Sequence, residues 1–321
     1  MSNIGHRFIK TNGINMHIAE QGSGPLIILC HGFPEGWYSW RHQLPALAEA
    51  GFHAVAPDQR GYGQTDQPEA IEDYDIFQLT GDIVGLVHAL GEDQAVIVGH
   101  DWGAPVAWHC ALLRQDMFRA VGLFSIPYVP RTWDDLRPTD AMRLMAGDYE
   151  FYQLYFQEPG KAEVDLEADV DRTIRMMMYS GSGDAPPEKR WRFIFEKSEK
   201  LTDIGCVPDT LPDWLTEQDV EYMVGEFKRT GFRGGVNWYR NIDRMWERTP
   251  FLTGAKLYQP SMFVAGEVDT IVAIYGGALN TLEQVIPNLR KKVLISGAGH
   301  WVQQERPAEV SNHLVEFLKG L

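Results

Sequence analysis

The sequence predicts an α/β fold in which a mostly parallel sheet has helices on both faces and is interrupted by a helical insertion. Continuous apolar runs, typical of strands buried on both faces, occur at residues 26–30, 53–56, 95–98 and 121–124. Stretches with helical spacing of apolar residues lie between them, at 37–50, 76–90 and 102–113. This alternation predicts a parallel sheet between two layers of helices.

The chain is expected to begin with a hairpin. Two strand-like segments, 6–11 and 14–21, flank the dipeptide Asn12-Gly13. This dipeptide is typical of a tight two-residue hairpin turn.

The alternation of strand and helix stops near residues 127–130, and no buried-strand run is seen again until after Pro250. The region between instead has helix-like stretches at 164–179, 188–197, 217–229 and 236–248. Thr216 and Asp219 form a capping box for the third stretch, and Gly231 suits its end.

Strand-like runs return at 261–265 and 291–295, with a helical region between them and a closing helix at 306–318. We therefore predict a core domain of residues 1–128 and 249–321 and a helical cap domain of residues 129–248. Because open α/β sheets bind ligands beyond the carboxyl ends of their strands, such a cap is expected to act as a lid.

The composition excludes several classes of protein. The 321 residues contain 44 Asp plus Glu against 29 Lys plus Arg, a net charge of −15 that disfavours nucleic acid and anionic membranes as partners. Three cysteines without a Cys-x-x-Cys pair or zinc spacing favour a reducing cytoplasm and predict no metal site. No apolar run approaches the roughly 20 residues of a membrane helix. The sequence leaves open whether a signal peptide was removed earlier. No cofactor is expected, because no phosphate loop or Gly-x-Gly-x-x-Gly follows a strand.

The most informative motif is Gly-His-Asp-Trp-Gly at 99–103, which follows a predicted strand and precedes a predicted helix. This context is typical of a nucleophile elbow, a tight turn that needs small neighbours around the exposed central residue. That residue is Asp101, which is ionised at neutral pH without a base. A carboxylate suits displacement at a saturated carbon and leaves an alkyl ester, which water must then hydrolyse. On its own, the motif is equally compatible with Asp101 as a helix cap.

Two later motifs favour the catalytic interpretation. His300 lies in Gly-Ala-Gly-His-Trp at 297–301, directly after a predicted strand, and is the expected base. Asp269 ends Gly-Glu-Val-Asp at 266–269, after another strand, and would orient His300 and stabilise its cation. The order nucleophile, acid, base is that of α/β-hydrolase enzymes.

The expected oxyanion hole uses two backbone N–H groups. One comes from the loop after an early strand, where His-Gly-Phe-Pro at 31–34 points to Phe33, and the other from Trp102, directly after the nucleophile. The Phe33-Pro34 bond is a candidate cis peptide. His31 is interpreted as structural.

Together these motifs resemble the epoxide hydrolases of the α/β-hydrolase superfamily, close to the soluble type. The resemblance spans nearly the whole chain, through His-Gly-Phe-Pro-Glu at 31–35, Asp-Gln-Arg-Gly-Tyr-Gly at 58–63 and the motifs at 99–103, 266–269 and 297–301. We interpret the motif at 58–63 as structural, bracing neighbouring loops.

The resemblance also implies two cap tyrosines that hold the epoxide oxygen. The segment 151–160 resembles the first tyrosine motif and indicates Tyr152, although Tyr149 and Tyr155 lie nearby. The segment 237–241 resembles the second and indicates Tyr239. Phenols suit this role because they can donate hydrogen bonds and a proton to the alkoxide of an opening ring.

We therefore predict an epoxide hydrolase that forms a covalent ester on Asp101 and hydrolyses it with water activated by His300 and Asp269. Its partners would be a small apolar epoxide and water, and the chain would be a monomer or a homodimer. One alternative is a haloalkane or haloacid dehalogenase, which would use the same Asp nucleophile and could bind halide through the indole of Trp102. Another is a non-catalytic ligand-binding protein that keeps the fold.

Overall fold

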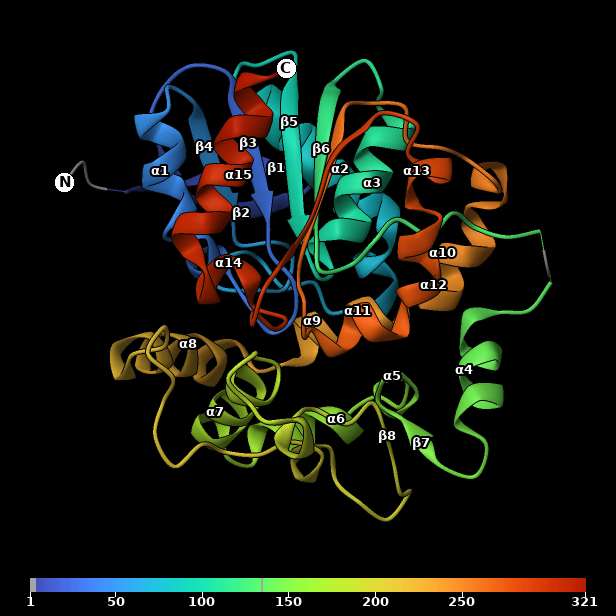
Figure 1. The fold of residues 1–321 in the computed structure, drawn as a ribbon. Coiled ribbons are helices and arrows are strands. Elements are labelled where there is room, and N and C mark those ends of the chain that lie inside the picture. The colour runs from blue at the N-terminus through green and yellow to red at the C-terminus, as the bar shows by residue number, and fades with distance from the viewer. Residues whose placement is uncertain (1–3, 134) are drawn as a thin grey trace.

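The computed structural model of the protein describes residues 4–133 and 135–321 and confirms the predicted fold class (Figure 1). An eight-stranded sheet has the strand order β1-β2-β4-β3-β5-β6-β9-β10. Neighbouring strands from β4 to β10 pair in parallel, whereas β2 runs antiparallel to both β1 and β4. The strands are β1 Gly5–Thr11, β2 Ile14–Gln21, β3 Leu26–Cys30, β4 His53–Pro57, β5 Ala95–His100, β6 Phe118–Phe124, β9 Ser261–Gly266 and β10 Leu289–Ile295.

The predicted hairpin is present. Thr11 pairs with Ile14 across the turn, and Asn12 and Gly13 both have positive φ, 41° and 80°. A turn of this kind requires positive φ at both central positions, which Asn and Gly adopt more readily than other residues.

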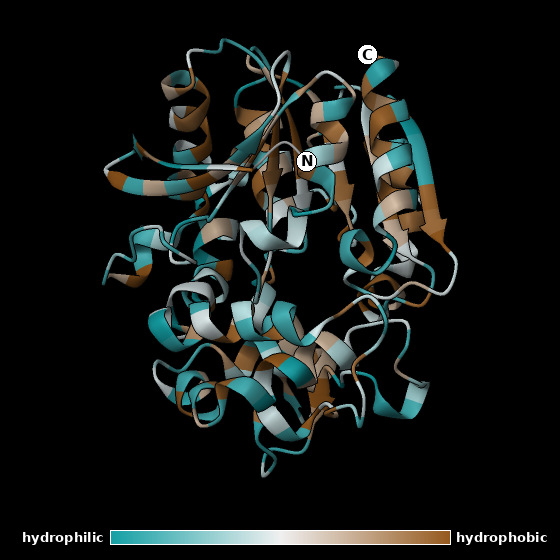
Figure 2. Ribbon diagram, turned by 90° about the vertical axis from the view of Figure 1, so that its left-hand side faces the viewer, coloured by the Kyte–Doolittle hydropathy of each residue, from teal (hydrophilic) through white to brown (hydrophobic). Residues whose placement is uncertain are grey.

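The central strands β3, β4, β5, β6 and β9 are mostly apolar because both faces of the sheet are buried there. In β3, Ile28 packs into one hydrophobic cluster and Ile27 into the other, since successive side chains of a strand point to opposite faces. Helices α2 (Ile76–Ala89) and α3 (Gly103–Leu113) close the first face. The second is closed by α1 (Gln43–Glu49) and α15 (Pro307–Lys319), and the apolar colouring of the central strands is visible in Figure 2.

The predicted core helices are present with small changes. The stretch predicted as one helix at 37–50 is a 3₁₀ turn, Trp37–Trp40, followed by α1. The region between β9 and β10 forms three short helices, α11 Thr270–Ile274, α12 Gly276–Asn280 and α13 Leu282–Val285. Helix α14 (Val302–Glu305) precedes α15.

The chain between β6 and β9 forms the helical cap, most of which lies below the carboxyl ends of the strands (Figure 1). Its helices are α4 Pro138–Ala146, α5 Tyr152–Tyr155, α6 Lys161–Glu167, α7 Val170–Ser180, α8 Glu217–Thr230, α9 Arg233–Arg240 and α10 Ile242–Arg248. The capping box of Thr216 and Asp219 is present, and Gly231 ends α8 with φ 67°. The predicted limits of the cap domain, 129–248, stay a prediction, and residue 134 within them lies outside the described residues.

Two of the predicted cap helices are each divided in the structure. The stretch 164–179 is divided between α6 and α7 because Asp169 is extended and caps α7 through a hydrogen bond from the N–H of Arg172. The stretch 236–248 is divided at Asn241, which lies between α9 and α10.

The prediction of a helix at 188–197 is wrong. Residues 187–189 form one 3₁₀ turn, and β8 (Ile194–Phe195) then pairs with β7 (Glu150–Phe151), a two-stranded sheet that the sequence analysis did not predict. Around β8, the backbone of this segment bonds to other parts of the cap: Trp191 N–H donates to Ser180, and Phe193 C=O accepts from Tyr152. These tertiary hydrogen bonds replace the local ones of a helix.

Over the residues that the structure describes, no helix has the length and apolar character needed to cross a membrane.

Candidate active site

Asp101 lies at a sharp turn between β5 and α3. Its φ is 49°, a left-handed conformation that is strained for a residue with a side chain. The turn is possible because both flanking positions are glycine: a Cβ atom at Gly99 would overlap the backbone of Gly103, and one at Gly103 would overlap that of Cys30. The strand–turn–helix geometry predicted for an elbow is therefore present.

The carboxylate of Asp101 points toward the loop after β3. Its Oδ1 accepts a hydrogen bond from the backbone N–H of Phe33 at 2.9 Å. A Cβ atom at Gly32 would overlap the Asp101 side chain, so this close approach requires glycine. The Phe33-Pro34 bond is cis, as proposed from the sequence. Asp101 does not act as the cap of α3, whose N-cap residue is Trp102.

His300 and Asp269 meet Asp101 from the loops after β10 and β9. His300 Nδ1 lies 3.1 Å from Asp269 Oδ2, and its Nε2 lies 3.5 Å from Asp101 Oδ2. The other oxygen of Asp269 accepts from the N–H of Ile271 at 2.8 Å and so caps α11. Asp269 thus caps a helix and also contacts the imidazole.

The electrostatics of the three groups are coupled. Burial by itself would lower the pKa of His300, but the carboxylates of Asp269 and Asp101 raise that pKa well above its usual value. Burial would raise the pKa of Asp101, but the hydrogen bond and charge of His300 outweigh it, so this pKa is lowered. Both shifts favour the charged forms of His300 and Asp101.

Tyr152 and Tyr239 come from the cap and line the same cavity, with ring centroids 6.0 Å apart. Burial raises the pKa of both phenols above 10, so each keeps its proton at any ordinary pH. The neighbouring tyrosines are placed differently. Tyr155 donates its hydroxyl to Asp165, and Tyr149 is about half exposed.

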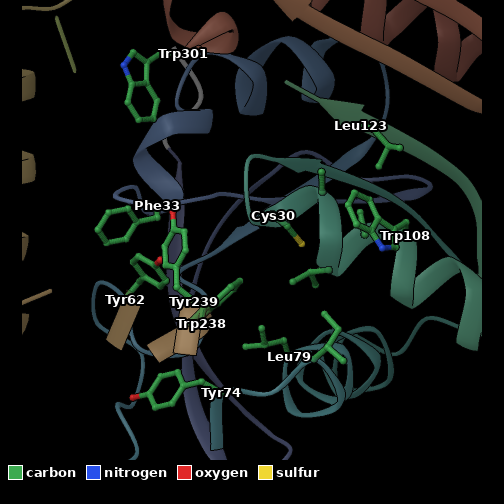
Figure 3. Close-up of a cluster of buried hydrophobic side chains, with 14 of the residues drawn as sticks. Cys30, Phe33, Tyr62, Tyr74, Leu79, Trp108, Leu123, Trp238, Tyr239 and Trp301 are labelled. Atoms are coloured by element: carbon green, nitrogen blue, oxygen red, sulfur yellow. The ribbon is translucent and has the colours of Figure 1, made fainter. Parts of the chain in front are cut away.

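The cavity between core and cap is lined largely by aromatic side chains. Phe33 packs edge-on against Tyr239 at 5.5 Å between ring centroids, and Figure 3 shows these two side chains together near Tyr62. The further lining residues are Pro34, Phe156, Met177, Gly181, Trp191, Phe193, Thr270, Ile271 and Trp301. Among the lining side chains, only Asp101 and His300 carry charge, so the cavity suits a small apolar molecule.

Sequence reasoning missed two groups of site residues. Trp191 and Phe193 line the cavity from the segment wrongly predicted as a helix. Glu35 and His100 form a buried pair, with Nδ1 of His100 2.7 Å from Oε2 of Glu35 and Nε2 2.8 Å from the carbonyl oxygen of His300. The signal for this pair was available, since both residues belong to the motifs that contain Phe33 and Asp101.

The residues interpreted as structural make structural contacts. His31 Nε2 accepts from the N–H of Gln59. Asp58 accepts from the backbone of Trp37 and Gln64 and from His17. Among residues 4–133 and 135–321, no group of three or more His, Cys, Asp or Glu side chains is arranged to hold a metal ion.

Comparison with known proteins agrees with this geometry. The α/β hydrolase fold family matches residues 25–167. Epoxide hydrolase A of Mycobacterium tuberculosis is 47% identical over 317 residues, covering 98% of this chain and 97% of that protein. Epoxide hydrolase 2 of Siraitia grosvenorii is 40% identical and covers 99% of both chains.

Solved structures show the same relationship. An epoxide hydrolase from an endophytic Streptomyces superimposes with a TM-score of 0.96 at 45% identity, covering 100% of this chain and 96% of that one. Epoxide hydrolase A from Mycobacterium thermoresistibile superimposes with a TM-score of 0.93 at 46% identity, covering 99% of both chains.

The fold is that of an α/β-hydrolase, and it brings Asp101, His300 and Asp269 into contact beyond the carboxyl ends of the strands. With identities of this size over its whole length, the chain belongs to the epoxide hydrolases of the α/β-hydrolase fold. The family and enzyme class predicted from the sequence are thereby confirmed.

Proposed function

We propose that this protein converts a small apolar epoxide and water to a vicinal diol through a covalent ester on Asp101. The observation that carries the proposal is that two kinds of group line one cavity: a hydrogen-bonded carboxylate from the core and two protonated phenols from the cap. An epoxide needs both at once, because its carbon is attacked while its oxygen gains charge.

In the first step, Asp101 attacks a ring carbon. Oδ1 is held by the N–H of Phe33, so Oδ2 is the attacking atom. The carbon–oxygen bond of the ring breaks, and the oxygen takes a proton from Tyr152 or Tyr239 while the other phenol donates a hydrogen bond. The product is a hydroxyalkyl ester of Asp101.

In the second step, His300 removes a proton from water, and the resulting hydroxide adds to the carboxyl carbon of Asp101. The oxyanion on Oδ1 stays hydrogen-bonded to Phe33, and the N–H of Trp102 is the proposed second donor. Collapse of this intermediate releases the diol and restores the Asp101 carboxylate. The imidazolium of His300 protonates the departing alkoxide, and the proton of the new Asp101 carboxyl group returns through solvent to the phenolate that the first step left.

Ester formation prepares His300 for this role. The free carboxylate of Asp101 contributes to the raised pKa of His300. Once Asp101 is esterified that charge is gone, so the pKa of His300 falls toward the range in which a neutral imidazole acts as a base. Asp269 remains to orient the ring and stabilise the cation.

Under this proposal the predicted cap domain, residues 129–248, closes over the substrate and supplies both phenols. The largely aromatic lining, in which only Asp101 and His300 carry charge, supports a small apolar epoxide as substrate. The monomer or homodimer expected from the sequence stays a prediction.

A dehalogenase would use the same three core residues on a carbon–halogen bond. It would need donors for a halide, and Trp102 was the candidate. Its indole, however, packs edge-on against the ring of Tyr239, with centroids 5.1 Å apart, next to a phenol that suits an oxygen leaving group. A ligand-binding protein without turnover would not need the strained Asp101, whose conformation costs roughly 1–3 kcal/mol.

The test compares diol formation by the wild type and Asp101→Asn with a panel of aryl and alkyl epoxides. We expect diol from the wild type and loss of at least about 1,000-fold in the variant. Intact mass must show that the asparagine has not deamidated. Absence of diol from every epoxide, with halide released from haloalkanes, would favour the dehalogenase, and tight binding without product would favour the binding protein.

A further inference from the structure

The loop that carries His300 is joined directly to the cap. The N–H of His300 donates to the carbonyl oxygen of Gly181 at 2.7 Å, and the indole N–H of Trp301 donates to that of Met178 at 2.9 Å. A Cβ atom at Gly299 would overlap the backbone of Gly183, so the two chains are in backbone contact. The position of the base therefore depends on how this part of the cap is seated.

Glu305 holds this junction together with its carboxylate. Oε2 accepts from the N–H of Gly183 on the cap at 2.9 Å and from the N–H of Gly299 at 2.8 Å. Oε1 accepts from the N–H of Trp301 at 3.0 Å. One side chain thus binds the amides on both sides of His300 and connects them to the cap.

Burial of the Glu305 carboxylate is energetically unfavourable. Glu305 is only 4% exposed. Among the residues that the structure describes, no Lys, Arg or His side chain forms an ion pair with its carboxylate. The guanidinium of Arg306 donates to the carbonyl oxygens of Glu305 and Gly297 instead, and the nearby charged side chain on the cap is Asp184. Burial, together with Asp184, raises the pKa of Glu305 to about 7 in spite of its three N–H donors. A buried carboxylate without a counter-ion usually costs stability, so a role in stability alone does not account for it.

We propose that Glu305 is a positioning residue for the second half of the reaction, which couples the seating of the cap to the placement of His300. The inference rests on the proposed two-step function. Ester formation needs Asp101 and the phenols but not His300, whereas ester hydrolysis needs His300 aligned with a water molecule. Loss of the Glu305 contacts should therefore slow hydrolysis and leave alkylation nearly unchanged.

The loop has other supports that let it survive this loss. The carbonyl oxygen of His300 accepts from His100 and from Ser125 Oγ, at 2.8 and 3.0 Å. Glu305→Gln keeps the shape of the side chain and one accepting oxygen. If that oxygen faces the N–H groups of Gly183 and Gly299, the side-chain NH₂ group faces the N–H of Trp301 and cannot accept a hydrogen bond from it. The loop then loses its hydrogen bond to Glu305 on one side of His300. Glu305→Ala removes all three contacts.

The experiment measures both half-reactions in single-turnover stopped flow with styrene oxide, following tryptophan fluorescence and acid-quenched intact mass. Glu309→Gln is the matched control, because Glu309 is an exposed glutamate four residues further on. We expect hydrolysis to fall roughly 10- to 100-fold in Glu305→Gln and further in Glu305→Ala, with alkylation within about twofold of wild type. The alkyl-enzyme should accumulate, and the melting temperature of Glu305→Gln should stay well above the assay temperature, so that the variant is folded when its rates are measured.

Two results would overturn the inference. One is an unchanged hydrolysis rate in Glu305→Gln, and the other is an equal fall in both rates, which indicates a structural role. If Glu305→Ala fails to fold, Glu305→Gln alone decides between these results. A wild type that forms no diol and no covalent adduct contradicts the proposed function itself, whereas a wild type that forms both and a variant with an unchanged ratio of rates contradicts only the role of Glu305.

Discussion

Nε2 of His300 lies 3.5 Å from Oδ2 of Asp101, the carboxylate oxygen that the N–H of Phe33 leaves free. The proposed nucleophile and the proposed base are therefore close enough to form an ion pair before substrate binds. This contact depresses the pKa of Asp101 and contributes to the raised pKa of His300. The same relationship suggests how the site changes during turnover, because alkylation removes one of the two charges.

Replacing the base should stop the reaction halfway. We expect His300→Phe to react once with an epoxide and to keep the substrate as an ester on Asp101, since the alkylation step does not require the imidazole. Steady-state turnover should fall by about 1,000-fold or more. Intact mass after incubation with substrate should show an increase by the mass of one epoxide. A folded variant without this adduct would contradict the two-step scheme.

Asp269→Asn tests the partner of the base while preserving the local fold. The asparagine oxygen can still accept the N–H of Ile271 and cap α11, but the charge that stabilises the imidazolium is lost. We expect turnover to fall by roughly 100- to 10,000-fold, with hydrolysis affected more than alkylation. The melting temperature serves as the control and should change little. Turnover by the variant equal to that of the wild type would contradict a role for Asp269 in the mechanism.

The alkylation rate should depend on the two cap phenols, Tyr152 and Tyr239, and not on other tyrosines of the cap. Tyr152→Phe and Tyr239→Phe should each slow alkylation by roughly 100-fold, because each removes one donor from the developing alkoxide. Tyr149→Phe is the matched control, since Tyr149 is about half exposed, and should alkylate at the wild-type rate. Stopped-flow alkylation rates decide the matter. If the two cap variants and the control behave alike, another group holds the epoxide oxygen.

The two half-reactions should respond differently to acid. Alkylation requires the Asp101 carboxylate, whose lowered pKa keeps it ionised at mildly acidic pH, and it is lost only as the pH falls through that lowered value. Hydrolysis requires neutral His300, which Asp269 still biases toward the protonated form, so it is lost earlier as the pH falls. The fraction of alkyl-enzyme in steady state should therefore rise as the pH is lowered from 8 to 5. Acid-quenched intact mass measures this fraction, and a constant fraction would refute the assignment of His300 as the base.

The alkaline side of the same profile has its own expectation. Burial raises the pKa of both phenols above their usual value, so they keep their protons. Alkylation should show no decrease from pH 8 to pH 10 if the protein stays folded, which circular dichroism can confirm. A decrease centred near the ordinary pKa of tyrosine, roughly 10, would show that the phenols are less buried than the structure indicates.

The glycines of the elbow make a prediction about stability. A methyl group at Gly99 would overlap the backbone of Gly103, so Gly99→Ala should destabilise the protein by about 1–3 kcal/mol or more. Gly225 lies within α8 and has open space around its Cβ position, so Gly225→Ala should stabilise it by about 0.5–1 kcal/mol. Urea unfolding of both variants gives the comparison. Similar effects of the two changes would mean that the elbow can relax.

Much of the fold followed from local patterns. The Asn12-Gly13 turn, the buried strands and the capping box at Thr216 and Asp219 are encoded by neighbouring residues, and the structure contains each of them. The helix predicted at 188–197 failed because its backbone bonds to segments distant in sequence, such as Ser180 and Tyr152. Helical spacing of apolar residues carries no information about such partners.

The sequence by itself determined the candidate catalytic residues of this protein: a carboxylate at an elbow, followed in order by an acid and a histidine, each shortly after a strand. Parallel strands place these residues at one edge of the sheet, so their proximity was predictable. Only the tertiary structure decided which tyrosine enters the cavity, that Trp191 and Phe193 line it, and that Glu305 joins the His300 loop to the cap. These features depend on contacts between the cap and the core, and such contacts have no periodicity or spacing that could be read along the chain.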